Sequence, residues 1–183
     1  MDPQAATPDD LVRFWQEAGP SRWFKRDDDF DARFRSRFLS AHEAAAAGTL
    51  SGWTETAQGA LALLLLLDQF PRNAFRGTPR VYATDAAARK IADAAIAAGF
   101  DRQVDPALRS FFYLPFVHSE KLADLDRAVA LNEEAGAAES LRWARHHRDI
   151  VARFGRFPHR NAVVGRTSTP EEERFLAEGG FSG

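Results

Sequence analysis

The chain has 183 residues with 24 basic and 26 acidic side chains, so its formal net charge is −2. This length predicts a single domain over residues 1–183, with an ordered core from about residue 8 to about residue 178. The near-neutral charge argues against a general nucleic-acid binder. Because the chain has no cysteine, thiolate catalysis, iron–sulfur clusters and disulfides are excluded.

The start of the chain does not fit a secretory signal, because it carries Asp2, Asp9 and Asp10 and no apolar run. The longest apolar stretch, residues 60–67, is shorter than the roughly 20 residues that cross a bilayer. We therefore expect a cytoplasmic protein with no membrane partner.

Helix signals recur along the chain, and strand signals do not. Thr7 and Pro8 predict the N-cap and first turn of a helix over residues 11–18, which Gly19 ends. Three phenylalanines spaced four residues apart mark one face of a second helix that runs to about residue 47: Phe30, Phe34 and Phe38.

The central part of the chain predicts a buried helix followed by an alanine-rich one. Residues 54–70 are apolar around almost the whole helical circumference, and we expect Pro71 to end this helix. Thr84 is expected to cap the next helix, which runs to Ala98 and stops at Gly99.

The last third of the chain predicts four more helices. A short one opens at Asp105 and runs to Phe112, and Pro115 is expected to interrupt it. Two longer helices, over residues 119–135 and 137–154, meet at Gly136. The final helix has the strongest start signal, made of Thr169, Pro170 and Glu172. We expect an all-α domain of seven or eight helices in stacked antiparallel pairs.

Two segments of the chain echo each other. Residues 70–73 read Phe-Pro-Arg-Asn, and residues 157–161 read Phe-Pro-His-Arg-Asn. A glycine follows each asparagine after four residues, and a Thr-Pro pair follows later in both. A duplicated helical unit would produce such matching loops, and so would the shared chemistry of helix ends.

Asp68, near the end of the apolar helix, is predicted to be buried because it shares a face with leucines. A buried carboxylate at the negative end of a helix dipole needs a cation or several donors. Arg72 is the nearest candidate, with Arg160 and Arg166 available from the second echo segment. A structural ion pair is the competing interpretation.

Two histidines lie on predicted apolar helix faces. His147 falls in the middle of the stripe on its helix, with His146 on the shoulder, and His118 aligns with a stripe if its helix reaches back that far. Either could be a neutral core residue, or an acid–base or anion-binding group. Glu120 fits a simple acid of a first helical turn.

Residues 142–166 hold seven arginines and one acid, whereas the preceding segment, residues 119–139, is acidic. Antiparallel helices could neutralise part of this charge. The loop portion, residues 153–166, has no acidic partner nearby in the sequence, and an anion would suit its arginines. Sequence signatures of phosphate loops, dinucleotide binding, metalloproteases and nucleophile elbows are missing. We expect no cofactor and no metal site.

Three segments carry a family resemblance: residues 67–73, residues 111–120 and residues 153–161. Together with Trp23-Phe24 and the stretch from Arg166 to Glu172, they resemble the domain of unknown function 924 family, an uncharacterised and mainly bacterial family. The resemblance spans about residues 14–176. It implies an all-α fold similar to tetratricopeptide-repeat proteins, and it implies no activity.

Our preferred hypothesis is a helical binding protein whose two echo loops line a cleft for an anionic small molecule or the charged end of a peptide, beside an apolar wall of Phe111, Phe112 and Tyr113. The predicted ligand-binding residues are Asp68, Arg72, Asn73, His118, Arg156, His159, Arg160, Asn161 and Arg166, with His147 beside them. One alternative is an enzyme that uses His118 or His147 with Asp68 or Glu120 for acid–base chemistry. Another is a scaffold that holds partner helices.

Overall fold

The structure is a computed structural model, and it describes residues 6–182. Within these residues it contains helices and no strands, which confirms the all-α prediction. The described residues form ten α-helices, α1 to α10, where the sequence predicted seven or eight. The difference arises because α2, α5 and α7 have only four or five residues, too few to show an apolar period. The likeness to tetratricopeptide-repeat folds stays a prediction.

The chain divides into two compact units, each described here by itself. The N-terminal unit comprises Met1–Arg76 and Arg80–Pro115, and the C-terminal unit comprises Gly77–Pro79 and Phe116–Gly183. The short helix α7 (Leu114–Val117) carries the chain from one unit into the other. The single-domain organisation stays a prediction.

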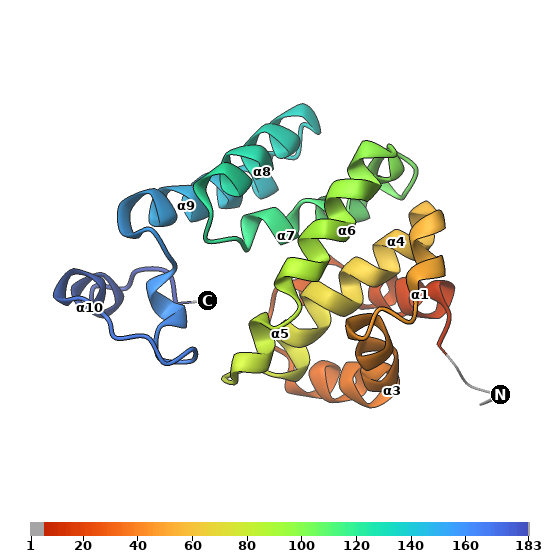
Figure 1. Cartoon of the computed structure of the whole chain (residues 1–183), viewed down its shortest axis with the longest axis horizontal. Coiled ribbons are helices and arrows are strands. Elements are labelled where there is room, and N and C mark those ends of the chain that lie inside the picture. The colour runs from red at the N-terminus through yellow and green to blue at the C-terminus, as the bar shows by residue number, and fades with distance from the viewer. Residues whose placement is uncertain (1–5, 183) are drawn as a thin grey trace. The chain divides into compact units, whose positions relative to one another are not determined.

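The N-terminal unit is built around α4, which packs against α1 and α6 (Figure 1). Its α-helices are α1 (Pro8–Ala18), α2 (Pro20–Trp23), α3 (Asp28–Ala46), α4 (Ala57–Leu64), α5 (Phe70–Ala74) and α6 (Asp85–Ala97). Its 3-10 segments are η1 (Ser51–Glu55), η3 (Pro79–Tyr82, whose first residue falls in the other unit), η4 (Phe100–Arg102) and η5 (Pro106–Phe112). Gly19 follows α1 with a φ of 73°, which confirms the predicted helix end.

Pro71 does not end the central helix, so this prediction is wrong. A π-helical turn, η2 (Leu65–Gln69), follows α4, and Pro71 lies inside the next helix, α5. Proline lacks an N–H, which would leave the carbonyl of the preceding turn without its donor. Side chains supply donors here: Nδ1 of His42 lies 2.9 Å from the carbonyl oxygen of Leu66, and the Thr84 hydroxyl donates to that of Leu67 at 2.5 Å.

Thr84 precedes α6 as predicted, but its side chain makes no cap hydrogen bond. Its hydroxyl donates to the carbonyl of Leu67 instead. The 3-10 segment η5 agrees with the predicted short helix before Phe112, and the Asp105 side chain accepts from the Ala107 amide at its start. Pro115 lies inside α7 and does not break the chain into a loop.

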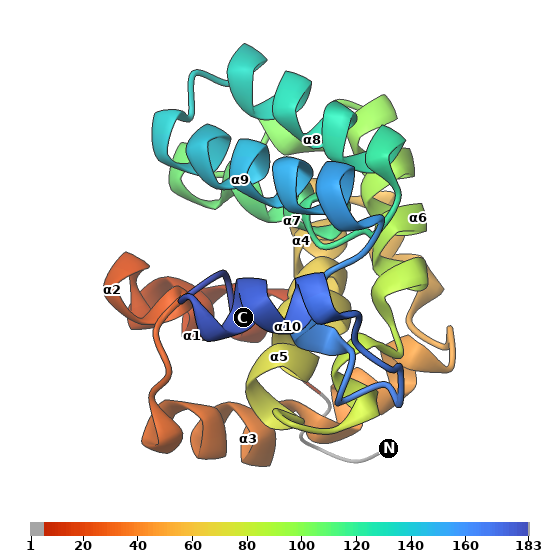
Figure 2. The same cartoon turned by 90° about the vertical axis from the view of Figure 1, so that its left-hand side faces the viewer.

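The C-terminal unit contains an antiparallel helix pair and a shorter final helix. The pair, α8 (Leu122–Glu134) and α9 (Ala138–Phe154), lies side by side in both views (Figures 1 and 2). Gly136, with a φ of 65°, makes the turn between them as expected. A small core of Leu125, Ile150, Val151 and Phe157 forms here.

The final helix, α10 (Pro170–Ala177), follows the 3-10 turn η6 (Pro158–Arg160) and has the predicted capping box. The Thr169 hydroxyl accepts from the Glu172 amide at 3.2 Å, and the Glu172 carboxylate accepts from the Thr169 amide at 2.7 Å. At its other end the amides of Gly179 and Gly180 donate to the carbonyls of Leu176 and Phe175. This is a Schellman turn, and it reverses the chain direction before Phe181.

Candidate functional site

The predicted ligand-binding residues fall in two groups, one in each unit. Asp68, Arg72 and Asn73 belong to the N-terminal unit. The others belong to the C-terminal unit: His118, Glu120, His147, Arg156, His159, Arg160, Asn161 and Arg166. A cleft between the two echo loops stays a prediction.

Asp68 is buried, as predicted, and Arg72 is the cation that pairs with its carboxylate. The carboxylate is 1% exposed, lies 3.3 Å from Nη1 of Arg72, and accepts from Nε2 of Gln69 at 2.6 Å. Arg72 also donates to both oxygens of Asp85, at 2.9 and 3.2 Å. One guanidinium therefore holds two carboxylates from different helices, which is the arrangement of a structural ion pair.

Asn73 is also engaged within its own unit. Its Nδ2 donates to the carbonyl of Gln69 at 2.9 Å, and its Oδ1 accepts from Arg76 at 2.9 Å. Arg76 in turn donates to Asp31 on α3 at 2.9 Å. The polar groups of the first echo loop thus bind α5 to its neighbours.

In the C-terminal unit, Glu120 lies between α7 and α8 and holds Arg166. Nη1 and Nη2 of Arg166 donate to the two Glu120 oxygens at 2.7 and 2.8 Å, and the Phe157 amide donates to Oε1 at 2.8 Å. Burial alone would raise the pKa of Glu120. These hydrogen bonds, with the charges of Arg166 and Arg160, outweigh burial and lower that pKa.

The arginines of residues 153–166 have acidic partners, which lie far from them in the sequence. Arg156 donates to both oxygens of Glu172 at 2.6 and 2.8 Å, and Arg153 pairs with Glu171. Hydrogen bonds from Arg156 lower the pKa of Glu172 to about 2. The acids come from the first turn of α10 and from Glu120, up to 46 residues away, so spacing along the chain did not indicate them.

Asn161 helps to anchor α10. It is 1% exposed, and its Nδ2 donates to Glu172 at 3.2 Å and to Ser168 at 3.1 Å. The side chains of Arg156 and Asn161 therefore converge on the same carboxylate. Both residues hold the start of the final helix against η6.

His159 and Arg160 lie on η6. Nη2 of Arg160 donates to the backbone carbonyl of His118 at 2.9 Å, and its guanidinium lies 4.5 Å from the ring centroid of Phe157. Nδ1 of His159 is buried and has no hydrogen-bond partner among the described residues. Burial, and then the charge of Arg160, lower the pKa of His159 to about 4, so its ring is neutral at neutral pH.

His147 lies in the apolar stripe of α9, as predicted, and is 8% exposed. Its Nδ1 donates to the carbonyl of Trp143 at 2.8 Å, four residues back on the same helix. Burial lowers its pKa to about 3. This is the behaviour of a neutral histidine at the edge of a core.

Sequence reasoning missed Phe181, whose ring is surrounded by histidines. The ring centroids of His147, His159 and His146 lie 4.6, 5.0 and 5.8 Å from it. We call these three residues the histidine cluster. The glycine pair at residues 179–180, after a helix end, was the available signal that the chain turns back.

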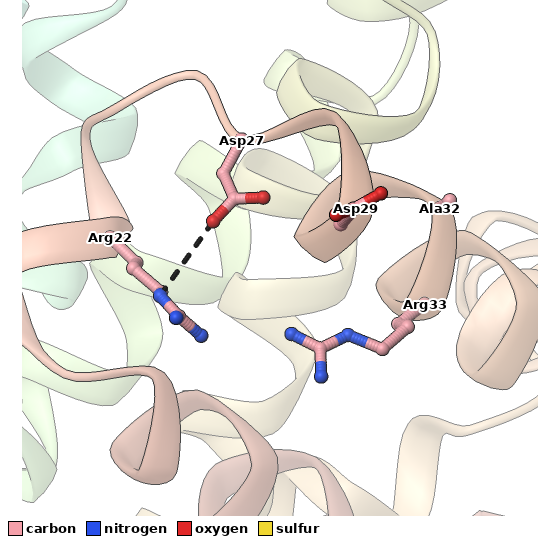
Figure 3. A pocket seen from close by; sticks show the side chains of 5 residues that line it. All are labelled: Arg22, Asp27, Asp29, Ala32 and Arg33. Carbon is pink, nitrogen blue, oxygen red and sulfur yellow. Dashed lines mark ion pairs between the residues drawn. The ribbon is translucent and has the colours of Figure 1, made fainter.

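Two shallow hollows lie along α3 in the N-terminal unit. One, of about 460 Å³, is lined by Arg22, Asp27, Asp29, Ala32 and Arg33, and an ion pair of 3.6 Å joins Arg22 to Asp27 across it (Figure 3). The other adjoins it at Ala32 and Arg33 and extends to Phe14. Charges of both signs line the first hollow, so it favours neither an anion nor a cation.

Phe111, Phe112 and Tyr113 are at most 1% exposed and lie in the interior of the N-terminal unit, so we do not assign them to a ligand wall. Among residues 6–182 no group of three or more His, Asp or Glu side chains is arranged to hold a metal ion. Over the same residues, every helix is too short or too polar to span a membrane.

The chain is similar to known proteins over nearly its whole length. The model of a family described as bacterial protein of unknown function (DUF924) matches residues 11–180. A solved structure of a protein of unknown function from Agrobacterium tumefaciens is 55% identical, with a TM-score of 0.91. The similarity covers 94% of this chain and 97% of that one. No curated protein sequence matches the chain.

Proposed function

Because the chain belongs to DUF924, a bacterial family of unknown function, as the sequence resemblance indicated, we propose its function from the geometry of the C-terminal unit. The proposed function is binding of a small anion, a carboxylate or a phosphate group, at His159, Arg160 and Arg166. The observation that carries this proposal is the buried Nδ1 of His159, a polar atom without a partner among the described residues beside two guanidinium groups.

The local charge favours an anion. Arg160, Arg166 and Glu120 are the charged side chains that act on His159. Glu120 balances one guanidinium, so with neutral histidines the sum is 2 − 1 = +1. A single negative charge would bring this cluster to neutrality, and burial strengthens such an interaction.

Donor groups are also available. Nε of Arg166 is buried and has no hydrogen-bond partner in the described part of the chain, although both terminal nitrogens bind Glu120. Nδ1 of His159 can donate in one tautomer of the neutral ring. A buried polar atom without a partner costs about 1–3 kcal/mol, so an acceptor oxygen from a ligand would stabilise both groups.

Other predicted site residues have a structural role in this proposal. Asp68, Arg72 and Asn73 are assigned to the polar network around α5, and Arg156 and Asn161 to the start of α10. This leaves a smaller set of ligand-binding residues than the sequence suggested.

Binding is better supported than acid–base catalysis. Glu120 uses both carboxylate oxygens for Arg166, and its lowered pKa makes it a weak base. His147 uses Nδ1 for its own helix, and its pKa of about 3 keeps it neutral. Neither residue has the pKa near neutrality that general acid–base catalysis favours.

Isothermal titration calorimetry with inorganic phosphate and with acetate tests the proposal. We expect at least one of them to bind the wild type, and Arg160→Gln to weaken that binding about tenfold or more, since a charged hydrogen bond contributes about 1.5–3 kcal/mol. Arg145→Gln is the matched control, because it removes the same charge from an exposed pair with Glu133 on the α8–α9 surface. Equal weakening by both variants, or no binding to the wild type, would contradict the proposal.

A further inference from the structure

Phe181 occupies a site made of polar aromatic rings. Its ring meets His147 and His159 edge to face, at centroid distances of 4.6 and 5.0 Å, and contacts His146 and Trp143 at 5.8 and 6.4 Å. Trp143 is 44% exposed and Phe181 is half-buried, so this cluster reaches the surface. Edge-to-face contacts of this kind favour an aromatic occupant.

The Schellman turn after α10 delivers Phe181 to this site. Gly179 has a φ of 83°, and the amide of Gly180 donates to the carbonyl of Phe175 at 2.9 Å. A Cβ at Gly180 would lie 2.5 Å from that carbonyl oxygen. The turn thus depends on glycine, and past it Phe181 lies outside the helix, where it contacts these rings and packs against the small core of Leu125, Ile150, Val151 and Phe157.

Phe181 leaves one polar atom of its site unsatisfied. The phenyl ring carries no donor or acceptor, yet it packs beside His159, whose buried Nδ1 has no hydrogen-bond partner among residues 6–182. An occupant that matched the whole site would offer a polar atom as well as a ring. The phenylalanine therefore fills the apolar part of the site and leaves this polar atom without a hydrogen-bond partner.

We infer that the site of Phe181 in the histidine cluster binds the aromatic ring of a small aromatic acid, and that Phe181 occupies it until such a ligand displaces its side chain. This inference rests on the proposed anion site and names the class of its ligand. His159 joins the two parts, because it contacts Phe181 and precedes Arg160 in the chain.

The ring and the acid group of such a ligand would lie close together. Phe157 contacts His147 and His159 at centroid distances of 5.5 and 5.6 Å, while the Arg160 guanidinium lies 4.5 Å from the same ring. The histidines around Phe181 and the Arg160 guanidinium thus share one neighbour, Phe157. An acid group attached directly to an aromatic ring, as in benzoate or phenyl phosphate, suits a ring site and a cation that share one neighbour.

The test compares each aromatic acid with its non-aromatic counterpart: phenyl phosphate with methyl phosphate, and benzoate with acetate. Calorimetry is carried out on the full chain as wild type, Phe181→Ala and Gly180→Ala. When the Phe181 side chain occupies the site, the apparent affinity for the ligand falls in proportion to the fraction of time that the site is open. We expect both variants to bind the aromatic acid about tenfold more tightly than the wild type, and the non-aromatic acid within about twofold.

Phe24→Ala is the control, because Phe24 is an exposed phenylalanine of the N-terminal unit, and it should leave all four affinities unchanged. If Phe181→Ala binds the aromatic acid no more tightly than its counterpart, the inference is wrong and the anion site stands. If none of the four acids binds any variant, the proposed function itself is wrong. If Phe181→Ala is unstable, Gly180→Ala, which keeps the phenylalanine, decides by the same comparison.

Discussion

Two glutamates organise the C-terminal unit, because each one accepts a fork of hydrogen bonds from an arginine far away in the chain. Glu120 holds Arg166 across 46 residues, and Glu172 holds Arg156 across 16. Each carboxylate also accepts a backbone amide, from Phe157 and Thr169 respectively. Charge-assisted forks of this geometry fix orientation as well as distance.

We predict a strong coupling between Glu120 and Arg166. Glu120→Gln and Arg166→Gln should each lower the free energy of unfolding by about 2 kcal/mol, because each leaves a partly buried partner without its counter-charge. The double variant should lose less than the sum, with a coupling of about 1–2 kcal/mol in urea unfolding followed by circular dichroism.

The exposed pair of Glu133 and Arg145 provides the control cycle. Its coupling should stay below about 1 kcal/mol, since both side chains are more than half exposed and water screens them. Equal coupling in the two cycles would show that the fork at Glu120 adds nothing to an ordinary surface pair.

At the scale of elements, the π-helical turn of the N-terminal unit explains how proline sits inside a continuous helix. Pro71 has no backbone N–H to donate to this turn, and the side chains of His42 and Thr84, from other segments, donate to the carbonyls of Leu66 and Leu67. Burial lowers the pKa of His42, so it remains a neutral donor to the Leu66 carbonyl. Carbonyls that lose their helical donors are satisfied by side chains in this way.

Thr84→Val should therefore destabilise the protein by about 1–3 kcal/mol, because it removes the side-chain donor of the buried Leu67 carbonyl while keeping the side-chain shape. The matched control is Thr54→Val, whose hydroxyl donates to the Ser51 carbonyl at an exposed position and should cost less than about 0.5 kcal/mol. Thermal unfolding measures both. A loss at Thr84 as small as that at Thr54 would contradict this role.

Local signals predicted most of the elements, and long-range contacts explain where they failed. The capping box at Thr169 and the glycine end at Gly19 depend on residues within one turn, so the sequence contains them. The prediction that Pro71 ends a helix failed because the side-chain donors of this turn, His42 and Thr84, are far away in the chain. They lie 24 and 17 residues from the carbonyls that they satisfy. No pattern along the chain predicts such distant donors.

In the candidate site, too, local signals predicted some features and long-range contacts explain the others. Burial of Asp68 and His147 followed from helical periodicity and is confirmed. The acidic partners of the arginine loop did not follow from it, because Glu120 and Glu172 reach that loop from other segments. Phe181 has no periodic pattern around it and depends on a turn.

For the whole molecule, buried neutral histidines predict a loss of stability in acid. The pKa of His147 falls from 6.5 to about 3 on folding. Between these values the unfolded chain binds a proton that the folded chain does not, so stability is full above pH 6.5 and decreases as pH falls toward 3. The slope from this residue is about 1.4 kcal/mol per pH unit.

His147→Leu should flatten this dependence. Between pH 6.5 and pH 4 it should lose about 3 kcal/mol less than the wild type, measured by urea unfolding across the pH range. Comparison at pH 8 separates the packing effect of the substitution, because His147 is neutral there in both the folded and the unfolded state. Parallel pH profiles for the two proteins would show that His147 titrates equally when folded and unfolded.

The π-helical turn also restricts how the helices of the N-terminal unit can assemble. Its two carbonyls are consecutive, and their donors come from different sides: His42 from α3 and Thr84 from the start of α6. Sliding the central helix by a single residue would separate both donors from their acceptors at once. An apolar helix such as Ala57–Leu64, whose leucines could pack in several neighbouring alignments, is thereby given one register.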